Sequence, residues 1–283
     1  DVELKDPWIS EKPQGKHGGT LLTTLLGDPK TWNTIIAQET SSTDITDGYI
    51  FERMVTRNGV TTGFEPELAK SWEISEDGTV YTFHLRRGVK WSDGEEFTAD
   101  DVIFTMDVIK DEDVSTSSRD VLMVDGQFPE YRKIDKYTVQ FEIPKPYAPF
   151  LNSNPYIIPK HKLYDAWKAG NFNDMWGIDT PVNEIVGTGP FTLGQYKPGE
   201  RVVMIRNANY WRRDPEGKPL PYITRWVRVI ASSQETQALM FEKGQTHYLA
   251  VRGIDFNRFK QKAEAGNYHM VDAGPTFSTN FLV

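Results

Sequence analysis

The sequence predicts a mixed α/β fold, in which mixed sheets are combined with separate helices (α+β). Three segments carry this prediction, namely 79–85, 99–110 and 137–143. In the first and third, apolar and polar residues alternate, which is typical of a half-buried strand. In the second, apolar residues recur every three to four positions behind a good helix cap, which indicates an amphipathic helix.

Length and composition are those of an ordinary globular protein. The chain has 283 residues, of which 38% are hydrophobic and 25% charged, enough for one large or two medium cores. No run approaches the roughly 18 apolar residues that a membrane helix needs. A net charge of -8 argues against nucleic acid as a partner, because phosphate binding depends on clustered Lys and Arg. The absence of cysteine excludes disulfides and zinc–thiolate sites.

At the N-terminus, residues 1–17 hold prolines and mixed charge, which predicts an extended arm. Segment 19–26 predicts the first buried strand, and segment 28–33 a turn-rich loop after it. The polar run 38–47 supplies favoured cap residues, so we expect it to precede a helix over 48–57.

The central segment is typical of a hairpin followed by a capped helix. A Glu-Asp-Gly turn at 76–78 predicts a hairpin over 72–85, because glycine takes positive φ without steric cost. Thr98 is a good N-cap for a helix over 99–110, since carboxylates follow it in the first turn. This helix should bury one apolar stripe, formed by Val102, Met106 and Ile109.

The next part of the chain holds one clear strand between irregular segments. Segment 115–126 is rich in Ser and Asp and predicts a loop. The strand predicted over 137–143 ends at Pro144, because proline cannot donate to a sheet ladder. Five prolines in 144–160 exclude regular structure there, and 163–169 predicts a short helix.

The last third alternates strands with capped helices. Two strands should pair around the Lys-Pro-Gly turn at 197–199. Serine at the start and glycine at the end delimit the helices. The strands are expected at 189–196, 201–206 and 223–231, and the helices at 233–243 and 255–265.

Two longer strings of residues resemble the signature of a known family. The first is L-A-x-S-W-E-x-x-x-D-G-x-x-Y-T-F-x-L-R-x-G-V-K-W-x-D-G-x-x-F-T-A-x-D-V, from Leu68 to Val102. The second is G-T-G-P-F from Gly187, followed by Tyr196, Pro198-Gly199-Glu200-Arg201, Asn207 and Tyr210-Trp211. With a weaker match at 18–21, they resemble the large solute-binding proteins of ABC importers, the family that contains the dipeptide- and oligopeptide-binding proteins.

This resemblance implies a type II periplasmic-binding-protein-like lobe, the N-terminal half of a two-lobed clamshell. Segments 18–57 and 185–273 would form the ligand-facing core of lobe I, and segment 58–184 an accessory subdomain with the signature hairpin and helix. Segment 274–283 would be a hinge strand toward a second lobe. The apolar run 281–283 ends without a turn or cap, so we expect the chain to continue.

The implied function is that of the solute-binding component of an ABC importer. Such a protein captures peptides or other small solutes and delivers them to a membrane permease, without cofactor or catalysis. We expect a periplasmic or extracellular monomer. Because the chain opens without the basic start and apolar core of a signal peptide, we expect a leader upstream, and a membrane anchor if a lipidated cysteine lies there.

The resemblance also implies solute contacts in two segments. In the family, the loop after the first strand faces the ligand, which here selects Trp32, Gln38, Glu39, Thr40, Ser41 and Ser42. The hinge run offers donors and acceptors at Thr276, Phe277, Ser278, Thr279 and Asn280. Residues 40–44 are also favoured helix caps, so a capping role and a ligand-binding role are both open for them. An extended peptide would bind by strand addition.

Other functions are open as well. An oligosaccharide binder is the nearest alternative, because exposed Trp rings stack on sugars and the chain has eight Trp residues. Trp72, Trp91 and Trp211 lie beside turns of the signature and are expected in the core. A glycoside hydrolase would need paired carboxylates in a cleft, and a protein-interaction module would need a flat surface.

Motifs for other chemistry are absent or have a structural explanation. The five histidines never fall at metal-ligand spacing, and there is no Gly-x-Ser-x-Gly. The segment 187–190 lacks the Lys and Ser/Thr of a phosphate loop. The acidic pairs at 95–96 and 100–101 suit a helix start better than acid–base catalysis. Solvated surface positions are expected for Arg212, Arg213, Arg225 and Arg228.

Overall fold

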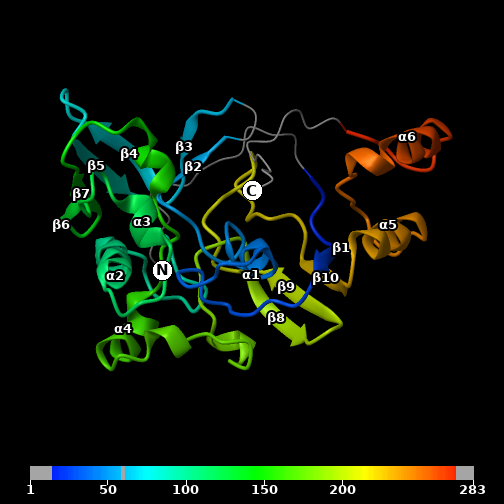
Figure 1. The fold of residues 1–283 in the computed structure, drawn as a ribbon, viewed down its shortest axis with the longest axis horizontal. Coiled ribbons are helices and arrows are strands. Elements are labelled where there is room, and N and C mark those ends of the chain that lie inside the picture. The colour runs from blue at the N-terminus through cyan, green and yellow to red at the C-terminus, as the bar shows by residue number, and fades with distance from the viewer. Residues whose placement is uncertain (1–14, 59–60, 272–283) are drawn as a thin grey trace.

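Two four-stranded sheets organise the chain in the computed structural model, which describes residues 15–58 and 61–271 (Figure 1). The first sheet has the strand order β1-β10-β9-β8; β1 pairs with β10 in parallel and the other neighbours are antiparallel. This sheet joins the start of the chain to strands far along the sequence. Its strands are β1 (Thr20–Leu26), β10 (Arg225–Ala231), β9 (Arg201–Arg206) and β8 (Phe191–Lys197).

The second sheet is antiparallel throughout, with the order β4-β5-β7-β6. In Figure 1 it lies at the opposite end of the molecule from the last two helices, α5 (Gln234–Glu242) and α6 (Phe256–Glu264). Its strands are β4 (Ala69–Ile74), β5 (Val80–Leu85), β7 (Thr138–Glu142) and β6 (Glu130–Asp135). A two-stranded sheet, β2 (Val55–Arg57) with β3 (Phe64–Pro66), completes the described strands.

The predicted hairpin and capped helix are confirmed. β4 and β5 pair across the predicted turn, and α2 (Ala99–Lys110) packs on β6 and β7. Thr98 and Asp101 form a reciprocal capping box, in which Asp101 Oδ2 accepts from the Thr98 backbone N–H at 2.9 Å. The apolar stripe of α2 is fully buried, as expected for Val102, Met106 and Ile109.

The helix predicted over 48–57 is wrong. The helix is α1 (Thr40–Thr46), formed by the polar run itself, and 55–57 is strand β2. Gly48 has φ +75, a left-handed conformation that ends a helix. The apolar residues after it are buried in the core as irregular chain, so their helical spacing reflects burial alone. The loop predicted over 115–126 also contains a short helix, α3 (Ser118–Leu122).

The remaining elements follow the sequence closely. β8 and β9 pair around the predicted turn, and β7 and β10 lie within the predicted strands. The helix predicted over 163–169 is α4 (Lys160–Lys168), and Ser233 caps α5. The described ranges also contain four short 3₁₀ helices: η1 (Ala148–Ser153), η2 (Phe172–Asp174), η3 (Val182–Glu184) and η4 (Gly253–Asp255). Of these, η1 lies in segment 144–160, where no regular structure was expected; Pro149 is tolerated there because it stands in the first turn. None of the helices in the described ranges has the length and apolar character needed to cross a membrane.

The G-T-G string forms a tight backbone junction between the two sheets. A Cβ on Gly187 would lie 1.9 Å from the Ile50 carbonyl oxygen, and one on Gly189 would lie 2.4 Å from that of Tyr49. The Gly189 N–H donates to Ile50 O at 2.9 Å, and Ser92 N donates to Gly187 O at 2.9 Å. Only glycine allows this approach. The string is therefore a packing element, as the absence of a phosphate-loop Lys predicts.

Candidate functional site

The candidate site lies at the carboxyl end of β1. Strand β1 runs parallel to β10, so both strands end at the same edge of the sheet, where open α/β sheets bind ligands. The strand continues into a loop and then into α1; we call residues 27–47 the β1 loop (Figure 1). Because this loop is the predicted ligand-facing segment, its anchoring and its exposed groups decide what it offers to a solute.

The start of the β1 loop is held by the turn between β8 and β9. Asp28 Oδ1 accepts from the Tyr196 hydroxyl at 2.7 Å and from the Gly199 N–H at 2.9 Å. The Tyr196 ring in turn packs edge-on against Trp32, with ring centroids 5.3 Å apart. Both Tyr196 and Gly199 belong to the second signature string. Residues of this string therefore help to hold the β1 loop in place.

The middle of the β1 loop is bound by the segment 175–177. The Trp32 N–H donates to Trp176 O at 2.8 Å, and the Thr31 hydroxyl donates to the same carbonyl at 3.2 Å. Asn33 Nδ2 donates to Met175 O at 3.4 Å. These contacts tie the β1 loop to a segment that follows it by more than 140 positions.

Ser42 is the hub inside the loop. Its Oγ accepts from the backbone N–H groups of Lys30, at 2.9 Å, and Thr31, at 3.2 Å, and donates to Glu39 Oε1. One donor and two lone pairs are the full capacity of a hydroxyl, so Ser42 has none left for a solute. Burial acts to raise the pKa of Glu39, but the bonds from Ser42 and the backbone outweigh it and leave that pKa below its usual value.

The end of the loop is closed by Asp47. Its Oδ1 accepts from the Thr34 hydroxyl at 2.7 Å and from the Thr46 hydroxyl at 2.9 Å. Burial raises the pKa of Asp47, and these hydroxyl bonds offset the effect only in part. The carboxylate thus joins both ends of the segment that contains α1.

Arg228 holds α1 against the sheet, which corrects the expectation that it lies on a solvated face. Its side chain is 11% exposed and donates to the carbonyl oxygens of Asp44 and, at 3.3 Å, Thr24. A cation bound to late carbonyls of a helix is favourable. Burial lowers the pKa of the guanidinium. Arg228 is therefore an anchor of the β1 loop.

The described residues provide no partner for three amide or hydroxyl side chains of the β1 loop, those of Gln38, Thr40 and Ser41. Gln38 and Thr40 are exposed, and Ser41 is half-buried. Their carboxamide and hydroxyl groups provide donors and acceptors of hydrogen bonds without a net charge. The inner polar groups of the loop are bonded, except for the buried Trp32 Nε1.

The structure differs from the sequence expectation at Trp32. Its ring is 0% exposed and packs in the core, so it presents no surface to a solute in this conformation. Trp91 and Trp211 are also fully buried, as expected, and Trp72 packs partly buried against the core. The predicted contacts in the hinge run lie outside the described residues: Thr276, Phe277, Ser278, Thr279 and Asn280.

A buried charged cluster corrects the surface position expected for Arg212. The Arg212 guanidinium lies 3.0 Å from Glu67 and 3.7 Å from Glu52. Glu52 is 1% exposed and accepts from Trp211 Nε1 at 2.7 Å and from the Tyr210 hydroxyl at 3.1 Å. Burial, together with the charge of Glu67, raises the pKa of Glu52 to about 8. At neutral pH the Glu52 carboxyl group is therefore mostly protonated.

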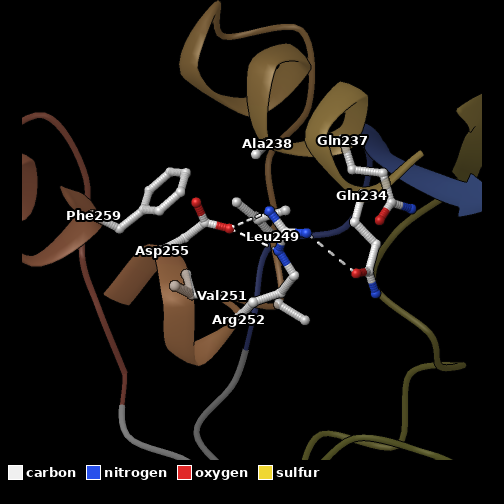
Figure 2. Close-up of a pocket in the computed structure, with 9 residues that line it drawn as sticks. Gln234, Gln237, Ala238, Leu249, Val251, Arg252, Asp255 and Phe259 are labelled. Atoms are coloured by element: carbon white, nitrogen blue, oxygen red, sulfur yellow. Dashed lines mark hydrogen bonds and ion pairs between the residues drawn. The ribbon is translucent and has the colours of Figure 1, made fainter. Parts of the chain in front are cut away.

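A small cavity near α5 does not meet the requirements of a solute site. Figure 2 shows Arg252 at its centre, with Gln237 of α5 and Phe259 of α6 on its walls. Its volume is about 90 Å³, whereas small-molecule sites occupy about 300 Å³ or more. Its charges are already paired, because Arg252 lies 2.6 Å from Asp255 and 2.5 Å from Glu235.

Acidic residues form no metal site in the described part of the chain. No group of three or more potential ligands lies close enough to hold a metal ion among these residues. The acidic residues near the start of α2 have structural partners: Asp101 caps the helix, Asp100 lies 2.6 Å from Lys133, and Glu96 lies 2.6 Å from Lys136. These pairs explain the acidic residues without acid–base chemistry.

Sequence reasoning missed the residues that hold the loop. Asp28, Asp47 and Arg228 carry ordinary surface residue types, and nothing local distinguishes Trp176. The only available signal was that Tyr196 and Gly199 belong to the second signature string. That string indicated the family, but not that its residues contact a loop near the N-terminus.

Comparisons with known proteins agree with this fold. Residues 63–283 match the family described as bacterial extracellular solute-binding proteins, family 5. A probable ABC transporter-binding protein of Deinococcus radiodurans is 31% identical over 246 residues, which is 84% of this chain and 41% of that protein. The dipeptide-binding protein of Escherichia coli is 34% identical over 215 residues, 70% of this chain and 39% of that protein.

A solved structure shows the same fold. The periplasmic binding protein MelB of Agrobacterium fabrum, in complex with stachyose, matches with a TM-score of 0.75 and 26% identity, over 89% of this chain and 40% of that one. The present chain therefore spans about two fifths of the length of these relatives.

Proposed function

The chain belongs to the bacterial extracellular solute-binding proteins of family 5, and we propose that it is part of the binding component of an ABC importer that captures peptides. The captured peptide is delivered to a membrane permease, and the protein does no chemistry on it. Two lobes close over the solute, of which this chain supplies one.

The observation that carries this proposal is the difference in hydrogen bonding between the inner and outer sides of the β1 loop. Its inner polar groups, apart from the Trp32 Nε1, are bonded to the protein, whereas unbonded donors and acceptors lie outside at Gln38, Thr40 and Ser41. A rigid loop with uncharged hydrogen-bonding groups suits the backbone of an extended peptide, which carries alternating donors and acceptors. Such a surface gives affinity with little choice among side chains.

Peptides are favoured over oligosaccharides by the burial of Trp32. Sugar binding relies on exposed aromatic rings that stack on the pyranose face, and the Trp of the β1 loop is 0% exposed. The dipeptide-binding relative supports the peptide reading. The oligosaccharide alternative is supported by the fold that the chain shares with the stachyose-binding protein.

We propose solute contacts at Gln38, Glu39, Thr40 and Ser41, with Trp32 and Ser42 as supports of the loop. The hinge residues Thr276, Phe277, Ser278, Thr279 and Asn280 are proposed as further contacts. Because one wall of the site belongs to a second lobe, the 283-residue chain alone is expected to bind weakly. The proposed division of the chain into a lobe I core, an accessory subdomain and a hinge strand is the one drawn from the sequence.

The proposed setting is that of the family. We propose a periplasmic or extracellular monomer without cofactor, which a lipidated cysteine upstream would attach to the membrane. Docking of the closed form on an ABC permease completes the transport cycle.

Calorimetric titration tests this function. A version of the chain that continues to the length of its relatives is titrated with a panel of dipeptides and tripeptides and with stachyose, beside the 283-residue chain. The long version should bind peptides, and its triple variant Gln38→Ala, Thr40→Val, Ser41→Ala should bind them roughly tenfold or more weakly, as expected for the loss of one or two net hydrogen bonds.

The control is Gln245→Ala, which removes an exposed carboxamide without a side-chain partner in the described ranges. It should leave peptide affinity unchanged. Binding of stachyose but not of peptides would favour the oligosaccharide function. Peptide binding by the triple variant at unchanged affinity would place the site elsewhere.

A further inference from the structure

Trp176 has a backbone conformation that its residue type disfavours. Its φ is +61, in the left-handed region, where a bulky side chain is an outlier. The other non-glycine residues with positive φ in the described chain are Thr62 and Asp125, and both lie in exposed turns. Trp176 is 3% exposed. A strained conformation at a buried residue persists only where the surroundings hold it.

The side chain of Trp176 is fixed by an aromatic contact. Its indole stacks on Phe51, with ring centroids 5.6 Å apart and an angle of 23° between the planes. Phe51 itself is fully buried. A return to ordinary φ would move the backbone relative to this fixed ring, so the stack and the left-handed turn are coupled.

The left-handed conformation determines the direction of the Trp176 carbonyl group. Trp176 O accepts from the Trp32 N–H at 2.8 Å and from the Thr31 hydroxyl at 3.2 Å. The neighbours take part too, because Gly177 pairs with Thr31 in an antiparallel bridge and Met175 O accepts from Asn33. Core filling alone would need none of these bonds and no positive φ.

We propose that Trp176 is a positioning residue of the β1 loop. Its stacked ring offsets the strain of the left-handed conformation, and this conformation directs the Trp176 carbonyl toward residues 31 and 32. These bonds fix the position of the β1 loop relative to the sheet. They thereby also fix the position of the outward-facing groups from Gln38 to Ser41. The part of this proposal that concerns solute affinity rests on the proposed function. The part that concerns loop position does not.

Amide hydrogen exchange of the 283-residue chain, measured by NMR without solute, provides the test. Trp176→Ala removes the stack but keeps a Cβ, which disfavours positive φ. Exchange at the Trp32 N–H should therefore accelerate about tenfold or more beyond any change at the α2 amides, since the local bond is lost. Trp176→Phe keeps an aromatic ring on Phe51 and should leave Trp32 close to wild type.

Two further variants provide a second test and a control. Thr31→Val removes the hydroxyl bond to Trp176 O at nearly constant volume, and it should also accelerate exchange at Trp32. If Trp176→Ala does not fold, Thr31→Val still tests the bond to the Trp176 carbonyl, and an unchanged exchange rate at Trp32 would overturn the positioning role. Asp125→Gly relieves positive φ in an exposed turn and should change nothing at Trp32.

The outcomes separate the two proposals. The positioning role would be overturned if exchange at Trp32 changed only in step with the α2 amides, or if Trp176→Phe were as disruptive as Trp176→Ala. In the version that has the length of the relatives, Trp176→Phe should keep wild-type affinity in the peptide panel and Trp176→Ala should lose roughly fivefold or more. Absence of peptide binding by the wild type would contradict the proposed function and leave the exchange result standing.

Discussion

The Tyr196 hydroxyl donates a 2.7 Å hydrogen bond to Asp28 Oδ1 across 168 positions of sequence. The Gly199 N–H donates to the same oxygen, so the β8–β9 turn closes on the first residues of the β1 loop. Burial raises the pKa of Tyr196, and its bond to the Asp28 carboxylate raises it further. The phenol therefore stays protonated and donates throughout the physiological range.

Tyr196→Phe should loosen the β1 loop without disturbing the core. The ring and its edge-on contact with Trp32 remain, but Asp28 loses one of its two donors. We expect a loss of about 1–2 kcal/mol in the free energy of unfolding, since the bond is to a charged acceptor, as measured by urea denaturation. The control Tyr248→Phe, at a 62% exposed ring, should cost almost nothing. Equal effects of the two substitutions would contradict the anchoring role.

Alanine substitutions at the neighbouring residues Ser41 and Ser42 provide a matched comparison of stability. Ser42→Ala removes a buried hydroxyl that bonds Lys30, Thr31 and Glu39, and should destabilise by about 1–3 kcal/mol because two backbone N–H groups lose their acceptor. Ser41→Ala should leave stability within about 0.5 kcal/mol. Thermal unfolding of both variants is the measurement. A larger loss of stability for Ser41→Ala than for Ser42→Ala would show that other contacts hold the loop.

Gly187→Ala should be severely destabilising. The added Cβ would lie 1.9 Å from the Ile50 carbonyl oxygen, which is backbone and cannot rotate away. Forcing the junction apart should cost about 3 kcal/mol or more, seen as a lowered denaturation midpoint. Gly253→Ala, where an added Cβ meets nothing within 4 Å and φ is not positive, is the matched control. A mild effect of Gly187→Ala would mean that the junction yields easily.

Glu52 should make stability depend on pH. Its pKa rises from 4.5 to about 8 on folding. Below about 4.5 the carboxyl is protonated in both states. Between these values only the unfolded chain is ionised, so the free energy of unfolding falls as pH rises, by at most about 1.4 kcal/mol per pH unit for one proton. Above about 8 both states are ionised and this dependence ends.

Glu52→Gln tests this dependence because the amide imitates the protonated acid. The variant should lose the fall in stability between pH 4.5 and 8 that is due to Glu52, measured by urea denaturation over that range. Glu76→Gln, in an exposed turn, makes the same change of charge and should keep the wild-type profile. Parallel profiles of wild type and Glu52→Gln would show that Glu52 ionises normally in the folded protein.

Elements with a strong local pattern were predictable from sequence, and elements defined by long-range contacts were not. Thr98 and the stripe behind it determine α2, because capping and amphipathic spacing act within a few residues. The segment 48–57 has similar spacing but is no helix, since Gly48 and the contact of residues 49 and 50 with the G-T-G string override it. Local propensity yields to tertiary packing where the two conflict.

The candidate site shows the same division. The resemblance placed the solute contacts in the β1 loop, and the exposure of Gln38 and Thr40 is compatible with that proposal. The burial of Trp32 and of Ser42 was not foreseeable, because a Trp or Ser in a polar loop carries no signal of the side it faces.

By itself, the sequence determined the family, the mixed α/β class and most helices and strands, because these depend on residue order over short spans. Only the tertiary structure decided which polar groups of the β1 loop turn inward to Asp28, Ser42 and Asp47 and which stay free. At Asp28 and Thr31 the partners lie more than 140 positions away, at Tyr196 and Trp176, and hydrogen bonds of this range leave no periodicity in the sequence. At Ser42 and Asp47 the partners lie within the loop, but they meet only once the loop has folded back on itself.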